Sequence, residues 1–251
     1  MDTEKVDRDL YNKIAAQYAK KDLAKSSSLA RKFQLISAVR PLLRERKGFD
    51  TILEVGCGPG ASAKYLEGYF KKFIGVDQSD EIINCANSLF KKENIEFVVS
   101  NIKDFNFEKI ADLVLIVGSL HHMTELDQIM ERLKKIAKPD AFFVAIEAQR
   151  TNPIIQFVRR LRQMVDSTYS EKQHYFSPEE LRQLLASHGI KVLDVEYQGY
   201  FFPPFAQVIL WPQFIFAPLA FLATVVDSFI AKYFPDFLKR FSWNIVIRGQ
   251  F

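Results

Sequence analysis

The chain has 251 residues, enough to bury the core of one large α/β domain. Hydrophobic residues make up 48% and charged residues 25% of it, a composition that excludes wholesale disorder. The formal net charge of +4 is modest, the lysines are scattered, and no long basic run or RNA-binding signature occurs. The sequence therefore gives no indication of nucleic-acid binding.

The cysteines and the first residues indicate a compartment. Cys57 and Cys85 lie far apart and lack metal-ligand spacing, so we expect reduced thiols and no metal site in a cytosolic protein. Met1 to Arg8 is charged and has no apolar core, so we expect no secretory signal there.

The N-terminal segment is predicted to be helical. Apolar positions such as Leu10, Ile14 and Tyr18 recur at spacings of three and four, which predicts helices from about Asp7 to Leu43 with a break at residues 26–28. We expect residues 1–45 to form a helical lid segment before the first strand.

Short apolar runs then alternate with helical patterns. The runs predict strands over Thr51–Val55, Phe73–Val76, Ile95–Val99, Ala111–Val117 and Ala141–Glu147. Helices are predicted over Ala61–Phe70, Ser79–Phe90 and Glu125–Ile136, and a turn over Lys138–Asp140. This alternation predicts a parallel sheet with helices on both faces.

The rest of the chain completes the sheet. A basic amphipathic helix with Arg159, Arg160 and Arg162 is predicted after Asn152-Pro153. Another helix begins at Ser177-Pro178 and ends at His188-Gly189, and the last strands are predicted over Lys191–Tyr197 and Trp243–Arg248. The predicted fold class is α/β, doubly wound, with a mostly parallel seven-stranded sheet formed by residues 46–200 and 243–251, an N-terminal helical segment and an apolar insertion before the last strand.

The candidate ligand-binding turn follows the first strand. Gly56, Gly58 and Gly60 lack the Cβ that would keep a ligand away from the main chain, and ligands of such sheets bind at the carboxyl ends of the strands. Asp77 ends the second strand about twenty residues later, where it could accept hydrogen bonds from ribose hydroxyls. The pattern also fits a dinucleotide-binding fingerprint, and a glycine turn that only packs helix against strand is a third reading.

Three features favour a methyl-donor site over a dinucleotide site. Glu54 ends a buried strand, where a cofactor with an α-amino group would partner its carboxylate and a pyrophosphate would be repelled. Pro59 stiffens the turn, which is unusual for a pyrophosphate loop. The chain also ends with a helix and two strands rather than with a second βαβαβ half.

With these motifs the sequence resembles the class I, seven-stranded Rossmann-like methyltransferases of the small-molecule type, which use S-adenosylmethionine. The resemblance covers about residues 10 to 200 and the last strand. The segments that carry it are Leu53–Gly60, Gly75–Ser79 and Leu115–Met123.

The resemblance implies roles for individual residues. Gly56 and Gly58 would approach the methionine part of the cofactor, Asp77 its ribose, and Gln78 its adenine. Asn101 stands where the family often has aspartate, and its carbonyl would bond the adenine amino group. The cofactor-binding residues expected in this way are Tyr11 and Tyr18 of the aromatic lid segment, Glu54, Gly56, Gly58, Gly60, Asp77, Gln78, Asn101, Ile102 and Gly118.

Four residues are candidate catalytic groups. His121 and His122 follow the fourth strand, and we prefer His122 as general base because an alternating strand would point only one of them inward. The alternative is a packed loop histidine. Glu147 could orient a histidine or bind a substrate hydroxyl, or be a solvated strand end. His174 could close over substrate or be an exposed loop histidine.

The apolar insertion covers residues 201–242, and Gln198 to Val226 contains no charged residue. Its length would admit a membrane span, but Pro212 and Pro218 argue against a single straight helix. We weigh an interfacial or re-entrant helical hairpin on a bilayer, a lid over an apolar substrate, and a homodimer interface. Basic residues that would help bilayer contact are Lys232, Lys239, Arg240 and the Arg159–Arg162 group.

Together these features predict an S-adenosylmethionine-dependent methyltransferase that is cytoplasmic and peripheral to the membrane. The expected acceptor is a small molecule, lipid-linked or glycosylated, with O-methylation favoured. The alternatives are a C-methyltransferase of a quinone-like lipid and a catalytically silent, membrane-docked partner subunit.

Overall fold

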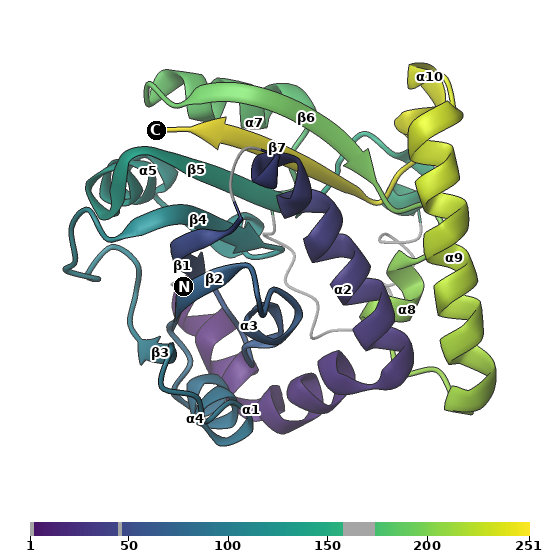
Figure 1. Cartoon of the computed structure of the whole chain (residues 1–251), viewed down its shortest axis with the longest axis horizontal. Helices are drawn as coiled ribbons and strands as arrows, with labels where there is room; N and C mark the ends of the chain where they lie inside the picture. Colours follow the sequence, from purple (N-terminus) through teal and green to yellow (C-terminus); the bar gives the residue numbers. More distant parts are fainter. Residues whose placement is uncertain (1–2, 45–46, 158–173) are drawn as a thin grey trace.

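The structure is a computed structural model that describes residues 3–44, 47–157 and 174–251 (Figure 1). Its centre is a seven-stranded sheet in the order β3-β2-β1-β4-β5-β7-β6. β7 is antiparallel to both of its neighbours, and the other pairs are parallel. The predicted fold class is confirmed.

The seven strands lie close to their predicted positions. Their bounds are β1 Phe49–Val55, β2 Phe70–Asp77, β3 Ile95–Val99, β4 Ala111–Val117, β5 Ala137–Ala148, β6 Lys191–Gln198 and β7 Asn244–Gln250. The central strands β1 and β4 are buried along most of their length, and all their buried residues except Glu54 are apolar, because helices cover both faces of the sheet. The predicted turn at Lys138–Asp140 lies inside β5, where Asp140 has a positive φ of 61° and the register with β4 shifts.

Helices cover both faces of this sheet. The N-terminal helices are α1 Thr3–Leu23 and α2 Lys25–Val39, followed by the short η1 Arg40–Leu43. The remaining elements are α3 Ala61–Tyr65, α4 Asp80–Leu89, η2 Leu120–His122, α5 Leu126–Ile136, α7 Pro178–Ser187, α8 Pro203–Gln207, α9 Gln213–Tyr233 and α10 Asp236–Lys239. α2, α3 and α4 pack on one face, while α5 and α7 pack on the other (Figure 1).

Two predicted boundaries are wrong because contacts with distant segments set them. The helical break lies at Ala24, and the serines at 26–28 belong to the first turn of α2, where the Ser26 N–H donates to Gln213 Oε1 of α9. α3 ends at Tyr65 rather than Phe70 because β2 begins at Phe70, which pairs with Phe49 of β1.

The insertion at 201–242 is helical, but its central part is not a hairpin. Pro212 precedes α9, and Pro218 lies near its start, so neither proline prevents one continuous 21-residue helix. α9 packs against α2 and is long and apolar enough to cross a membrane by length and composition. Residues 153–157 are helical, whereas Arg159, Arg160 and Arg162 lie outside the described residues.

A buried carboxylate joins the insertion to the sheet. Asp227 of α9 accepts hydrogen bonds from the main-chain N–H groups of residues 200–202, directly after β6. Asp227 is buried, and these N–H groups would otherwise lack partners at the point where the chain leaves the sheet. The contact positions α9 beside the end of β6.

Candidate active site

A cavity lies where the carboxyl ends of β1, β2 and β4 meet beneath α1. α1 contributes Glu4, Asp7, Arg8, Tyr11 and Tyr18 to its lining. The strand ends and the loops after them contribute Val55, Gly56, Gly58, Val76, Asp77, Gln78, Ser79, Ser100, Asn101, Ile102, Val117, Gly118, Ser119, His122 and Met123. Tyr11, Tyr18, Gly56, Gly58, Asp77, Gln78, Asn101, Ile102 and Gly118, all expected to bind the cofactor, thus surround one space.

The glycine turn gives this cavity one main-chain wall. Gly56 and Gly58 have positive φ values of 69° and 53°, which L side chains rarely adopt. A Cβ on Gly56 would lie 2.5 Å from Ser119 Cβ, whereas a Cβ on Gly58 would meet only the Tyr18 ring, at 3.5 Å. Gly58 therefore leaves the main chain open toward the cavity.

Gly60 has a different place. It also has a positive φ, of 81°, but a Cβ there would lie 2.5 Å from the Phe97 ring. Gly60 is not among the residues that line the cavity. Gly60 thus lets the start of α3 approach Phe97 of β3, and its contact with a cofactor stays a prediction.

Asp77 presents a buried carboxylate at the end of β2. Its Oδ2 accepts a hydrogen bond from the Gly58 N–H and its Oδ1 one from the Ser79 N–H, both at 3.0 Å. Burial raises the pKa of Asp77, and these hydrogen bonds oppose the rise. The contacts fix the carboxylate against the glycine turn.

Glu54 lies behind the cavity wall and does not line it. The side chain is 2% exposed, Oε1 accepts a 2.5 Å hydrogen bond from Ser62 Oγ, and Oε2 has no partner. Burial raises the pKa of Glu54 from 4.5 to about 8, and the nearby Asp77 charge adds to the rise. An unpartnered buried carboxylate oxygen is costly unless a donor or cation reaches it.

His122 and Tyr11 meet across the cavity. His122 Nε2 lies 3.3 Å from the Tyr11 hydroxyl, and Nδ1 lies 3.0 Å from Asp7 Oδ2. In the neutral tautomer that donates Nδ1–H to the Asp7 carboxylate, the Nε2 lone pair faces the Tyr11 hydroxyl. The edge of the Tyr18 ring packs against Tyr11, which closes this end of α1 over the site.

His121 and Glu147 form a separate pair outside the cavity lining. Glu147 is fully buried, and its Oε1 accepts from the N–H groups of Ser119 and Leu120. Its Oε2 lies 2.6 Å from His121 Nδ1. Glu147 is thus not a solvated strand end; it holds the loop that carries both histidines.

His174 lies away from the cavity. Its side chain is 59% exposed, its Nε2 lies 3.7 Å from Glu180 Oε1, and its ring packs edge-on against Phe176. In this structure it is not brought together with the other candidate residues.

Glu4 and Asp7 were not singled out from the sequence, although α1 places them on one face with Tyr11. The spacing of 4, 7, 8 and 11 is the helical pattern that could have revealed them. The sequence analysis assigned only the aromatic residues of this helix to the site, because carboxylates on a surface helix are usually solvated.

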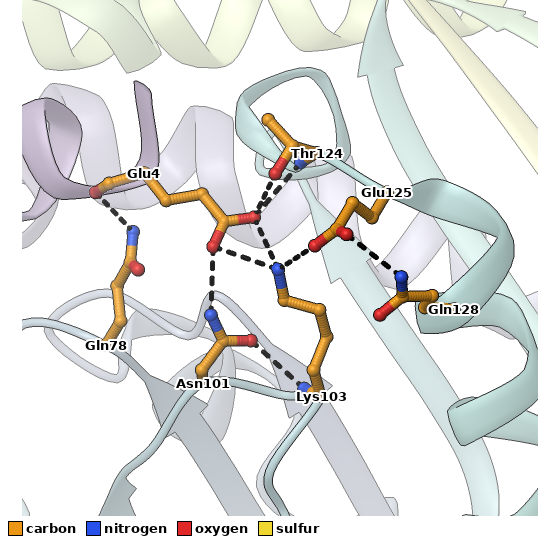
Figure 2. A network of polar contacts seen from close by, with 7 residues as sticks. All are labelled: Glu4, Gln78, Asn101, Lys103, Thr124, Glu125 and Gln128. Atoms are coloured by element: carbon orange, nitrogen blue, oxygen red, sulfur yellow. Dashed lines mark hydrogen bonds and ion pairs between the residues drawn. The ribbon is translucent and has the colours of Figure 1, made fainter. Parts of the chain in front are cut away.

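Glu4 ties α1 to the far rim of the cavity (Figure 2). Its carboxylate accepts hydrogen bonds from Asn101 Nδ2 at 3.0 Å and from Thr124 Oγ1 at 2.5 Å, and it pairs with Lys103 Nζ at 3.2 Å. Its main-chain carbonyl accepts from Gln78 Nε2. Asn101 Oδ1 accepts from the Lys103 N–H, so both ends of that amide have partners within the chain.

These residues fit the cofactor that the resemblance implies. The open main chain at Gly58, the carboxylate of Asp77 and the unpartnered Oε2 of Glu54 would suit a ligand with a ribose diol and an ammonium group. No group of His, Cys, Asp and Glu side chains that could hold a metal ion occurs in residues 3–44, 47–157 and 174–251.

Comparison with known proteins agrees with the fold. Residues 53–145 match the methyltransferase domain family. The chain superposes on magnesium protoporphyrin IX methyltransferase of Synechocystis, solved with bound S-adenosylhomocysteine, with a TM-score of 0.66 over 99% of both chains at 12% identity. Residues 53–145 therefore match a methyltransferase domain by sequence, and the whole chain shares the fold of this solved methyltransferase.

Two curated relatives share parts of this methyltransferase sequence. A fatty-acid O-methyltransferase of Mycolicibacterium smegmatis is 30% identical over 113 residues, 44% of this chain and 41% of that protein. A ubiquinone biosynthesis O-methyltransferase of Rickettsia akari is 22% identical over 151 residues, 58% of this chain and 60% of that protein. The chain therefore spans less than two thirds of the length of either.

Proposed function

We propose that the chain is an S-adenosylmethionine-dependent methyltransferase. The observation that carries the proposal is the Gly58 main chain and the Asp77 carboxylate on one cavity, with the unpartnered Glu54 oxygen behind it. Asp77 would accept from the ribose hydroxyls, and Glu54 would face the α-ammonium group, directly or through water. When bound, the cofactor supplies a methyl group on a sulfonium, an electrophile that needs only an aligned nucleophile.

His122 is the proposed general base for an oxygen nucleophile. Asp7 accepts from Nδ1–H, which leaves the Nε2 lone pair at the cavity surface, where the Tyr11 hydroxyl now lies. An acceptor hydroxyl that takes the place of the Tyr11 hydroxyl would pass its proton to Nε2. His121, held by Glu147, would keep the loop in position without touching the acceptor.

The proposed acceptor is a small apolar or lipid-linked molecule, methylated on oxygen at the surface of a membrane. α9 supports this part, because its outward face is a nearly unbroken row of exposed apolar side chains. The row comprises Phe214, Ile215, Leu219, Phe221, Leu222, Val225, Val226, Phe229 and Tyr233. The two curated relatives, a fatty-acid O-methyltransferase and a ubiquinone biosynthesis O-methyltransferase, are compatible with such an acceptor.

The cofactor assignment is tested by calorimetric titration with S-adenosylmethionine and, separately, with NAD. We expect binding of the first only, and a loss of about tenfold or more in the Asp77→Asn variant, which keeps the shape but removes the charge. NAD binding without S-adenosylmethionine binding would refute the methyltransferase assignment.

The membrane assignment is tested by pelleting with lipid vesicles. Replacing the exposed Leu222 and Phe229 of α9 with serine should reduce pelleting without changing cofactor affinity, because neither residue lines the cavity. A wild-type protein that stays in the supernatant as a monodisperse dimer would instead favour a homodimer interface on α9.

A catalytically silent, membrane-docked subunit is the second candidate. It is favoured by Asn101, whose amide is engaged at both ends by Glu4 and Lys103 rather than free to bond adenine. Absence of binding by both cofactors would support this alternative.

A further inference from the structure

A second hollow lies on the sheet face covered by α2, away from the cofactor cavity. α2 and α9 begin close together, at the Ser26–Gln213 hydrogen bond, and then diverge (Figure 1). Side chains of both helices and of the end of β6 line a groove between them. We call it the α2–α9 groove; its volume is about 1100 Å³. No described residue lines both it and the cofactor cavity.

The groove is rimmed by basic side chains. These are Lys32, Arg40, Arg44, Lys47 and Lys232, and all five are exposed. Within the described ranges, none of the five has a carboxylate at ion-pairing distance. Their positive charge is therefore available to a ligand.

The groove's own carboxylates do not neutralise this charge. Glu196 Oε2 lies 2.7 Å from Arg248 Nη2, and Asp227 accepts from the main-chain N–H groups of residues 200–202. Both acidic side chains are thus committed to partners that hold the fold. The groove is lined by five basic and two acidic side chains, so its net charge is positive and attracts an anion.

The walls between the cations are apolar. Leu29, Phe33 and Ile36 follow one another along α2 at helical spacing, and Tyr197 contributes from β6. On the opposite wall Phe221 of α9 is 60% exposed, and it belongs both to the groove and to the outward apolar row of α9. The apolar surface of the groove therefore continues onto the face proposed to lie on the membrane.

We propose that the α2–α9 groove binds the anionic headgroup of a membrane phospholipid while the outer face of α9 rests on the bilayer. This inference rests on the peripheral-membrane part of the proposed function. A free anion would use the basic rim but gain nothing from the apolar walls. A membrane lipid uses both, because its phosphate meets the cations and its glycerol and acyl portions meet Leu29, Phe33 and Phe221.

The test uses the full chain and vesicles of phosphatidylcholine alone or mixed equally with phosphatidylglycerol. The variant is Arg40→Glu with Arg44→Glu, both in or next to η1 and outside the cofactor cavity. The matched control is Lys91→Glu with Lys135→Glu, exposed cations outside the groove that give the same change in net charge. Each basic residue near an anionic surface contributes about fivefold in affinity.

We expect the wild type and the control pair to prefer the anionic vesicles. The Arg40/Arg44 variant should lose at least about 25-fold in affinity for them and keep its weak binding to the neutral ones. Cofactor affinity and the unfolding midpoint are measured for every variant. If the Arg40/Arg44 variant is unfolded, Arg40→Gln with Arg44→Gln replaces it, and we expect its affinity for anionic vesicles to be lower than that of the wild type but higher than that expected for the glutamate variant.

The possible outcomes distinguish a failure of the groove inference from a failure of the peripheral-membrane proposal. If no protein binds either vesicle, the peripheral-membrane proposal fails and the groove inference fails with it. If the wild type binds anionic vesicles but the groove variant and the control lose affinity equally, net charge drives binding and the groove inference alone is wrong. Saturable binding of inorganic phosphate that leaves vesicle binding unchanged would also overturn it in favour of a soluble anion.

Discussion

The unpartnered oxygen of Glu54 makes a prediction about folding stability that needs no substrate. Burial raises the pKa of this carboxyl from 4.5 to about 8 in the folded chain. The folded state therefore holds the Glu54 proton more tightly than the unfolded state does, so its stabilising effect is fully present below pH 4.5 and is lost as the pH rises through about 8. Between these values, the cofactor-free protein becomes less stable as the pH rises.

The size of this effect follows from the pKa difference. One pKa unit corresponds to about 1.4 kcal/mol, so ionising Glu54 in the cofactor-free fold costs at most about 5 kcal/mol over the whole window. Glu54→Gln keeps the shape and a possible hydrogen bond with Ser62 but cannot ionise. The variant should lack this part of the pH dependence and be more stable than the wild type near pH 8.

Urea unfolding of the cofactor-free protein at several pH values measures the slope. The control is Glu131→Gln, a solvent-exposed carboxyl whose replacement should leave the slope of the wild type unchanged. With S-adenosylmethionine present, the ammonium group favours ionised Glu54, so affinity should rise with pH in the wild type and less in Glu54→Gln. If wild type, Glu54→Gln and Glu131→Gln share one stability profile, the reasoning about Glu54 is wrong.

Three further predictions concern the contacts of His122, Asp227 and Glu4. His122→Ala should lower turnover about 100-fold or more with little change in cofactor affinity, and Asp7→Asn should produce part of that loss and shift the pH–rate profile; unchanged turnover in both would remove this pair from the mechanism. Asp227→Ala should lower the free energy of unfolding by about 2–4 kcal/mol, measured in urea, because it leaves the N–H groups of residues 200–202 without their acceptor; Asp227→Asn should lose less, and equal stability of all three proteins would contradict the anchoring role. Glu4→Ala should free α1 from the rim and speed cofactor association and dissociation about tenfold in stopped-flow measurements, whereas rates equal to those of the wild type would mean that α1 does not gate the site.

Sequence reasoning succeeded where the signal is local. Ser79 caps α4 as predicted, since its hydroxyl accepts from the Ile82 N–H, and Ser177 with Glu180 forms a capping box at the start of α7. The apolar runs at 95–99 and 111–117 predicted β3 and β4 with their observed bounds. Caps and buried runs depend on neighbours within a few residues, so the sequence contains them.

Sequence reasoning failed where distant segments decide the outcome. Lys138–Asp140 has turn chemistry, yet β5 extends through it because Ala137 pairs with Ala111 of β4. Pro212 and Pro218 were expected to argue against a single straight helix, yet α9 runs without a break from Gln213 through Pro218 to Tyr233. Pro212 precedes the helix, and Pro218 removes one main-chain hydrogen bond without ending it. Position within an element, which packing sets, determined what each of these residues does.

By itself the sequence determined the class of the fold, the glycine turn and the place of Asp77 at the end of the second strand, because strand alternation and the strand–turn–helix motif are written in consecutive residues. Only the tertiary structure decided which side chains meet. In the fold Asp7 contacts His122, which lies 115 residues later in the chain, and Glu147 contacts His121. Glu4 contacts Asn101 and so holds α1 over the cavity. Such contacts depend on where α1 packs against α4 and η2, and no local pattern records that.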